Sequence, residues 1–228
     1  MLKSKELRAK AWNSLKGKYW RAFIVVLVLG LLTSGGSSLV TLAQSMTELI
    51  DMVDPSEMDS TMELGATVIG AAASAFSLVG LLINVFVGNA ATVGQSNYFI
   101  KNVDTKPSFA EAFTGFKVKY FRNIGTILLM SVKLVLWSLL FVIPGIIKSY
   151  EYAMIPYILA DDAEITSKEA FKKAKEMMKG NKWRLFKLNL SFIGWYILCF
   201  ITLGAGTFFL IPYICAANAE FYAELKNQ

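Results

Sequence analysis

The segment LKGKYWR at residues 15–21 is followed directly by a long apolar run that begins at Ala22. Two later segments repeat this arrangement, FKVKYFR at 116–122 and MKGNKWR at 178–184. Basic and aromatic side chains gather where a helix passes from lipid headgroups into hydrocarbon. The repetition predicts a membrane protein that contains three copies of one unit. The predicted interface anchors are Lys18, Tyr19, Trp20, Arg21, Lys119, Tyr120, Phe121, Arg122, Lys182, Trp183 and Arg184.

Composition supports a membrane setting. Apolar residues make up 55% of the 228 residues, and the mean hydropathy is +0.48. One apolar run could be a buried helix of a soluble protein, but this chain has six, and several reach the ~20 residues that cross a bilayer core. The runs cover residues 22–43, 64–99, 124–143, 146–160, 185–203 and 205–222.

Charge is segregated along the chain, which predicts an orientation. Residues 1–21, 101–122 and 161–187 hold 20 of the 23 basic residues, whereas residues 44–63 hold six acidic residues and no basic one. Basic segments stay on the cytoplasmic side of a membrane, so both termini are expected there and the acidic loop outside. Because the positive charge lies at predicted membrane edges, we expect no nucleic-acid partner.

These patterns predict an all-α integral membrane protein with six transmembrane helices. The helices form three repeated hairpins, each preceded by a cytoplasmic amphipathic helix, within a single membrane domain over residues 1–228. The repeat units cover about residues 1–102, 103–164 and 165–228.

Two prolines recur within this repeat. Ile155-Pro156-Tyr157-Ile158 returns as Ile211-Pro212-Tyr213-Ile214. A proline inside a membrane helix leaves a carbonyl group unpaired, so Pro156 and Pro212 are expected to kink their helices at matching depths. The kinks could open a shared cavity or could be packing features.

The third amphipathic helix has the clearest boundaries. Thr166 and Glu169 fit a capping box, and Gly180 provides a stop. Lysines lie outside the apolar stripe. Such a helix could lie in the headgroup region with its lysines toward anionic lipids, or pack on the protein's own cytoplasmic face. The stripe consists of Ala170, Phe171, Ala174, Met177 and Met178.

The first hairpin differs from the others in its small residues. Ala66, Gly70, Ser74 and Gly80 predict a helix that approaches a neighbouring helix closely. The acidic loop is expected to extend this hairpin and to break at Asp54-Pro55.

Few ionisable residues lie inside the predicted spans. Lys133, Glu151 and Tyr152 form the candidate intramembrane polar site, and Lys148 is expected to extend toward the surface. Lys133 and Glu151 could form a structural pair within one hairpin. Alternatively, the three residues could line a polar cavity that contacts a lipid headgroup or an anionic solute.

No catalytic, metal or cofactor site is predicted. The chain has no histidine, which excludes histidine-based triads and histidine-ligated zinc. Its two cysteines, Cys199 and Cys215, lie in apolar runs, where packing is their commoner role. The carboxylates Asp161 and Asp162 most simply begin the third amphipathic helix.

Several motifs resemble a known family. They are MMKGNK at 177–182, FIGW at 192–195, TLGAG at 202–206 and PGIIKSY at 144–150. The chain resembles the domain of unknown function 975 family, multi-pass membrane proteins found mainly in Gram-positive bacteria. A looser similarity links it to membrane domains fused to glycerophosphodiester phosphodiesterases, but no such catalytic domain is recognisable here. The resemblance implies a bacterial cytoplasmic membrane and a topology, not a mechanism.

Two functions fit these features. One is a non-enzymatic membrane protein that binds anionic lipid headgroups or partner proteins through its cytoplasmic amphipathic helices, with homo-oligomers possible. The alternative is a small transporter or lipid-translocating protein that uses a polar cavity near Lys133 and Glu151.

Overall fold

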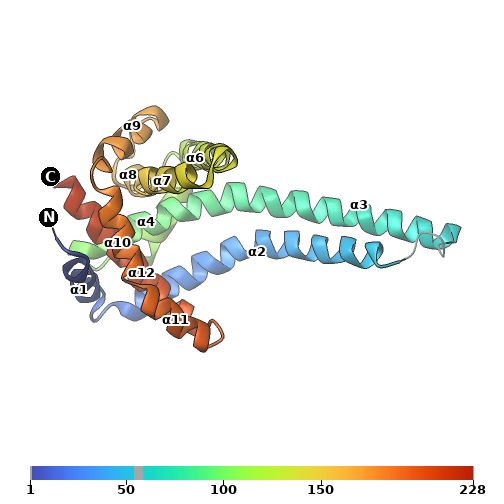
Figure 1. Ribbon diagram of the computed structural model, residues 1–228, viewed down its shortest axis with the longest axis horizontal. Helices are drawn as coiled ribbons and strands as arrows, with labels where there is room; N and C mark the ends of the chain where they lie inside the picture. Colours follow the sequence, from blue (N-terminus) through green and yellow to red (C-terminus); the bar gives the residue numbers. More distant parts are fainter. Residues whose placement is uncertain (1, 54–58, 228) are drawn as a thin grey trace. The chain divides into compact units, whose positions relative to one another are not determined.

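The computed structural model describes residues 2–53 and 59–227, and within these ranges it contains helices and no β-strand (Figure 1). The predicted break at Asp54-Pro55 lies outside the described residues. The helices are α1 (Ser4–Leu15), α2 (Tyr19–Asp51), α3 (Ser60–Ile83), the π-helix η2 (Asn84–Gly88), α4 (Asn89–Asp104), the 3₁₀-helix η3 (Phe109–Phe113), α5 (Thr114–Lys117), α6 (Tyr120–Leu140), α7 (Val142–Tyr152), α8 (Ile155–Asp161), α9 (Ser167–Met177), α10 (Lys182–Leu190), α11 (Ile193–Ile201) and α12 (Ala205–Lys226).

The predicted helical class is therefore confirmed, but six membrane spans are not. Four helical segments of the described chain are long and apolar enough to cross a bilayer: Tyr19–Asp51, Ser60–Asp104, Tyr120–Leu140 and Lys182–Ile201. The apolar run at 146–160 is divided between α7 and α8, which have 11 and 7 residues. The threefold repeat stays a prediction.

The chain divides into two compact units, one of residues Gly30–Gly88 and one of the remaining residues. In the first unit the later part of α2 packs closely on α3. A Cβ atom added to Gly80 would lie 2.5 Å from the carbonyl oxygen of Gly36, and one added to Gly36 would lie 2.6 Å from that of Gly80. The close approach predicted for the small-residue helix is thus present at Gly80, whereas a Cβ at Gly70 would meet open space.

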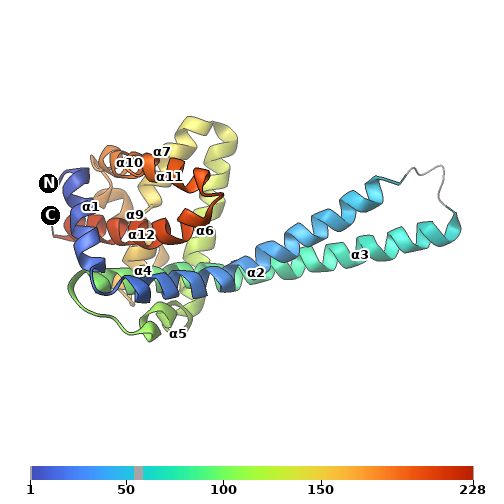
Figure 2. The ribbon, with the colours of Figure 1, turned by 90° about the horizontal axis from the view of Figure 1, so that it is seen from below.

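The second unit is built around α4, which contacts α5, α6, α8 and α12 (Figure 2). Its Tyr98 and Phe99 are buried, as are Phe221 and Tyr222 of α12. Helix α1 packs mainly on α12. The core of this unit therefore joins the first, middle and last parts of the sequence.

The two repeated prolines lie in different places within their helices. Helix α7 ends at Tyr152, and Pro156 stands in the first turn of α8. Pro212 lies inside α12. The first turn of a helix tolerates proline because its N–H groups have no intrahelical partner. Pro156 therefore begins a helix rather than kinking one.

Helix α9 forms as its sequence predicts and packs on the protein. Its capping box joins Thr166 and Glu169, and Gly180 takes a φ of +79° beyond its carboxyl end. Ala170, Ala174 and Met178 are fully buried, and α9 contacts α6, α7 and α8. This packing favours the second of the two predicted roles, a helix on the protein's own face. Its exposed lysines are Lys168, Lys172 and Lys175, and Lys179 is exposed just beyond its end.

We predict that Gly80→Ala destabilises the α2–α3 hairpin, because the added Cβ would meet backbone that cannot move aside alone. Overpacking of this kind costs about 1–3 kcal/mol. Gly70→Ala in the same helix should be neutral or slightly stabilising. Thermal unfolding in detergent compares the two, and equal melting temperatures would contradict the close contact.

Candidate functional site

Each basic-aromatic cluster contains a residue in the left-handed conformation, at the turn between two consecutive helices. The turn residue is Gly17 before α2, Lys119 before α6 and Gly180 before α10, with φ values of 76°, 46° and 79°. Glycine adopts this conformation freely, whereas a residue with a Cβ atom pays about 1 kcal/mol or more. We call the three clusters, residues 15–21, 116–122 and 178–184, the hinges.

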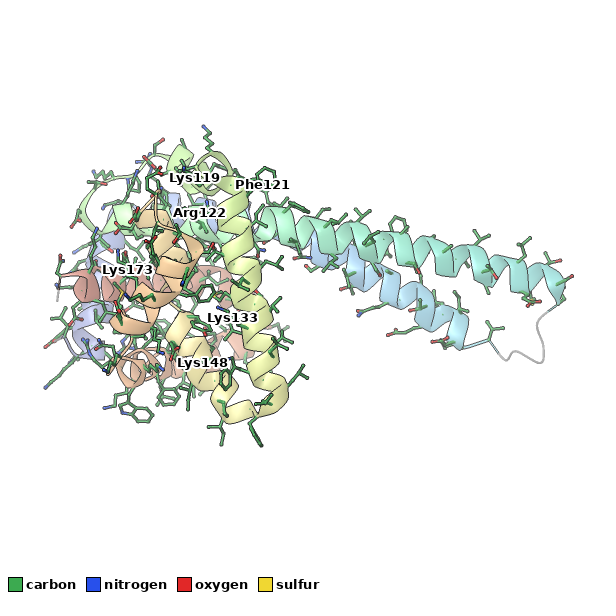
Figure 3. The ribbon with its side chains drawn as sticks, turned by 90° about the horizontal axis from the view of Figure 1, so that it is seen from above. Lys119, Phe121, Arg122, Lys133, Lys148 and Lys173 are labelled. Atoms are coloured by element: carbon green, nitrogen blue, oxygen red, sulfur yellow. The ribbon has the colours of Figure 1, made fainter. Side chains whose placement is uncertain are left out.

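The aromatic residue before each arginine points outward. Trp20, Phe121 and Trp183 are all exposed, and Figure 3 shows Phe121 on the outside of α6 near its start. Exposed tryptophan and phenylalanine beside basic residues suit a membrane interface. These three side chains keep the orientation that interface anchors need.

The basic residues of the hinges bind other parts of the protein, as Lys18 in the first hinge shows. Its ammonium group donates to the carbonyl oxygens of Asn102 and Thr105, at 3.1 and 2.6 Å. Both carbonyls belong to the carboxyl end of α4 and the residue that follows it. Burial lowers the pKa of Lys18, with a further contribution from the nearby charge of Lys106.

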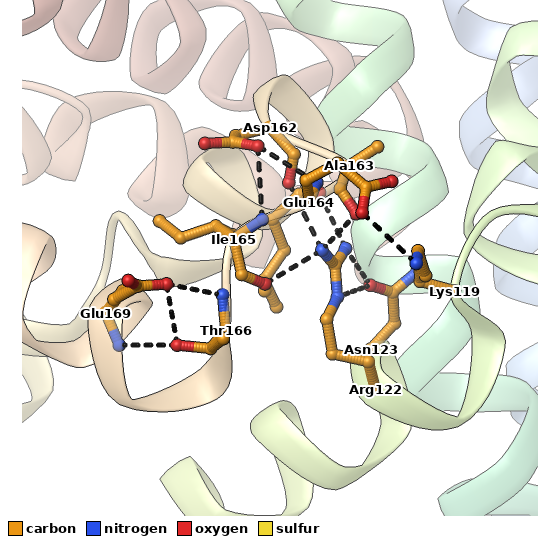
Figure 4. Close-up of polar contacts among 10 residues, drawn as sticks. Lys119, Arg122, Asn123, Asp162, Ala163, Glu164, Ile165, Thr166 and Glu169 are labelled. Atoms are coloured by element: carbon orange, nitrogen blue, oxygen red, sulfur yellow. Dashed lines mark hydrogen bonds and ion pairs between the residues drawn. The ribbon is translucent and has the colours of Figure 1, made fainter.

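In the second hinge, Arg122 closes the carboxyl end of α8 (Figure 4). Its side chain also contacts the Oδ1 atom of Asn123 at 2.7 Å. A guanidinium group presents several donors in one plane, so one arginine satisfies carbonyls that the helix leaves unpaired. It donates to the carbonyl oxygens of Leu159 (3.2 Å), Asp162 (3.3 Å), Ala163 (2.7 Å) and Ile165 (3.0 Å).

The segment that Arg122 holds leads into α9. Asp162 Oδ1 accepts hydrogen bonds from the backbone N–H groups of Glu164 and Ile165, at 3.0 and 3.1 Å. The Thr166 hydroxyl and backbone N–H both donate to the Glu169 carboxylate and lower its pKa. The turn and the start of α9 thus form one ordered unit (Figure 4).

In the third hinge, Arg184 binds the last turns of α12. Its guanidinium contacts both carboxylate oxygens of Glu224, at 2.7 and 2.9 Å, and the carbonyl oxygen of Leu2 at 3.1 Å. The backbone N–H of Leu2 donates to the same carboxylate. A basic residue of each hinge therefore holds the carboxyl end of a later helix: α4, α8 or α12.

Within the predicted polar site of Lys133, Glu151 and Tyr152, the two charged residues contact different partners. Glu151, whose side chain is 5% exposed, pairs with Lys148 at 2.7 Å and with Lys182 of the third hinge. Lys133 instead lies 3.8 Å from the centre of the Phe171 ring, and Phe171 packs edge-on against Tyr152. Figure 3 shows Lys133 and Lys148 along the α6–α7 hairpin. The partners of Glu151 come from α7 and α10. The pairing with α10 could not be predicted from residue spacing within the α6–α7 hairpin.

An apolar pocket lies between α1, α11 and α12. Its volume is about 490 Å³, and its lining is almost entirely apolar. The Tyr19 hydroxyl donates to the carbonyl oxygen of Phe209 at 2.6 Å, which joins the start of α2 to α12. Sequence reasoning missed this pocket because two stretches far apart in the sequence, residues 12–19 and 195–213, form it. The lining residues are Trp12, Tyr19, Trp195, Leu198, Cys199, Thr202, Gly206, Phe209, Leu210 and Tyr213.

A smaller and more polar pocket of about 240 Å³ lies between α7, α10 and α12. Ser149, Asn189 and Asn218 line it, and Lys133, Glu151 and Tyr152 do not. Across residues 2–53 and 59–227, no three acidic, cysteine or histidine side chains gather in a way that could hold a metal ion.

Comparison with known proteins identifies a family. The model of the family described as "Protein of unknown function (DUF975)" matches residues 1–150 and 139–228. No curated protein and no solved structure is significantly similar to the chain.

We predict that Arg122→Lys lowers the unfolding free energy by about 2 kcal/mol or more, because one ammonium group cannot reach the carbonyls that the guanidinium joins. The matched control is Lys119→Gln in the same hinge, whose ion pair with Glu164 is exposed (51% and 80%) and worth little. Thermal unfolding in detergent compares the variants. If Arg122→Lys unfolds like the parent protein, the carbonyl cluster is not important for stability.

Proposed function

The chain belongs to the DUF975 family of proteins of unknown function, and we propose that it is a non-enzymatic integral membrane protein that binds an anionic lipid. Its setting is the bacterial cytoplasmic membrane, with both termini on the cytoplasmic side. The proposal follows the sequence-based expectation of lipid binding through cytoplasmic helices and assigns it to a particular place, the pocket beside α1.

The observation that carries the proposal is the shape and chemistry of that pocket. About 490 Å³ lies within the range of small-molecule sites, and the lining suits an acyl chain rather than a polar solute. Trp12, Tyr19 and Trp195 stand at its walls. Tryptophan and tyrosine combine an apolar ring with a polar group, so they favour the zone where acyl chains meet headgroups.

A headgroup site lies next to the pocket on α1. Arg8 and Trp12 lie four residues apart and therefore share one side of α1, and Lys16 follows directly after the last residue of the helix. Lys16 is exposed, while Arg8 donates to the carbonyl oxygen of Ser191 at 2.7 Å. With Trp12 at the pocket wall, an anionic phosphate would lie near Lys16 and its acyl chain would enter the pocket.

Transport through a cavity near Lys133 and Glu151 has less support. Lys133 lies against the Phe171 ring, and the carboxylate of Glu151 is occupied by Lys148 and Lys182. These contacts suit a structural cluster. Binding of a partner protein or of a second copy of the chain is compatible with lipid binding and would use other surfaces.

We predict that Leu198→Trp weakens lipid binding by about tenfold or more, since the larger ring occupies the pocket. Ile197→Trp is the matched control, because Ile197 is the neighbouring residue, is similarly exposed (58% against 51%) and is not part of the lining. Titration of detergent-purified protein with a fluorescent phosphatidylglycerol measures the affinity. Equal affinities for the two variants would refute acyl-chain binding in this pocket.

We also predict that Lys16→Gln weakens binding of phosphatidylglycerol about fivefold, as expected from about 1 kcal/mol for one lysine near an anionic lipid. Binding of zwitterionic phosphatidylcholine should change little. Lys10→Gln on another side of α1 serves as the control for lost charge. A similar loss for both variants would mean that the helix attracts lipid only through its overall charge.

A further inference from the structure

The more polar pocket of about 240 Å³ plays no part in the proposed acyl-chain site. Residues of α7, α10 and α12 form it, and it shares no lining residue with the apolar pocket beside α1. Its volume is several times the ~30 Å³ that one water molecule occupies, and it is smaller than the ~300–1,000 Å³ of sites for drug-sized ligands. The pocket therefore suits a ligand about the size of glycerol or a monosaccharide.

Asn218 of α12 is the lining residue that the protein's own packing does not explain. Its Oδ1 atom is buried and has no hydrogen-bond partner. A buried acceptor without a partner has lost its bonds to water, and this loss destabilises the folded protein. An apolar residue of similar volume would carry no such penalty. The amide at position 218 therefore suits contact with a ligand better than it suits packing.

Other amides of the same compact unit hold one helix to another. Asn97 of α4 donates to the carbonyl oxygen of Glu111 at 3.0 Å. Asn102 also has a buried Oδ1 atom without a partner, but its Nδ2 atom donates to the carbonyl oxygen of Ser14 at 3.2 Å. Such bonds are the usual role of asparagine between apolar helices. The side chain of Asn218 has no bond of this kind within residues 2–53 and 59–227.

The other polar residues of the pocket define the chemistry of the ligand. Asn189 of α10 supplies a second amide. The Ser149 hydroxyl of α7 donates to the carbonyl oxygen of Ile146 at 2.7 Å, so its oxygen can still accept a hydrogen bond. The described residues that line the pocket carry no charge, so an ion inside it would lack a partner. Amide and hydroxyl groups together match the hydroxyl groups of a neutral ligand, which both donate and accept.

Apolar side chains complete the lining and suit the C–H groups of such a ligand. Met154 and Leu185 are buried, at 1% and 2% exposure. Tyr150 is held in place by the ring of Phe186, which it contacts edge-on at 6.0 Å between centroids. Phe186 in turn stacks on the exposed Trp183 of the third hinge. The pocket therefore lies beside a predicted membrane-interface anchor.

We propose that this pocket binds a neutral hydroxylated group of glycerol to monosaccharide size, with Asn218 and Asn189 as its hydrogen-bonding residues. A half-turn of the Asn218 amide exchanges its oxygen with its nitrogen, so this side chain can offer an acceptor or a donor. A free solute and the headgroup of a glycolipid share this chemistry. The site is independent of the acyl-chain pocket beside α1.

Thermal unfolding of the detergent-purified protein without ligand tests the role of Asn218. Asn218→Leu is expected to leave the melting temperature unchanged or to raise it by about 2–4 °C, because it removes an unsatisfied acceptor at similar volume. Asn97→Leu is the matched control and is expected to lower the melting temperature, because it breaks the bond to Glu111. A similar fall in both variants would show that Asn218 is structural and would overturn the proposal.

Titration calorimetry then measures binding with named probes. Glycerol and glucose represent free solutes, a monoglucosyl diacylglycerol represents a glycolipid, and gluconate is the charged comparison. Asn218→Leu is expected to weaken binding of the neutral probes about tenfold, as the loss of one or two hydrogen bonds implies. Leu198→Trp, which fills the pocket beside α1, should leave the affinity for glucose unchanged.

The pattern of binding identifies the source of the ligand. Binding of glucose or glycerol by the parent protein indicates a free solute, and binding of the glycolipid alone indicates a lipid headgroup. Gluconate that binds as well as glucose contradicts a neutral ligand. If none of the neutral probes binds, the pocket holds water only and the proposal fails. Glycolipid binding that is lost in Leu198→Trp but kept in Asn218→Leu also overturns it, because the lipid then occupies the pocket beside α1.

Discussion

Unpaired carbonyl groups at the carboxyl ends of helices are the constraint on which the rest of this structure depends. A helix leaves its last carbonyls without intrahelical partners, and near hydrocarbon water cannot always replace them. Lys18 and Arg122 bind such carbonyls at the ends of α4 and α8, and Arg184 holds the last turn of α12 through Glu224. These contacts join segments far apart in the sequence and order the turn that leads into α9.

Within each hinge, the basic and the aromatic side chains therefore have different roles. The basic side chain turns inward to the protein, while the neighbouring aromatic side chain stays exposed, as Arg122 and Phe121 do. A cluster that looks like one membrane anchor in sequence therefore has two physical roles. Other lysines, such as Lys16 and those on the outer side of α9, remain exposed, and under the proposed function they would face anionic lipids.

Packing of α1 and α9 against the protein also changes how the chain can meet a membrane. Their apolar residues, including Leu7 and Ala170, are already buried, so these helices cannot insert their apolar faces into lipid. Exposed large apolar side chains lie instead along α2, α3, α6 and α11, and the pocket beside Trp12 has an apolar lining.

The sequence by itself determined the helical class, the family, the capping box of α9 and the close approach at Gly80, because each depends on neighbouring residues or on composition. Only the tertiary structure decided that Glu151 pairs with Lys182 rather than Lys133, that Pro156 begins a helix, and that Trp12 and Trp195 line one pocket. Those outcomes depend on how distant helices pack, and side-chain periodicity within one segment carries no information about which partner its exposed face will meet.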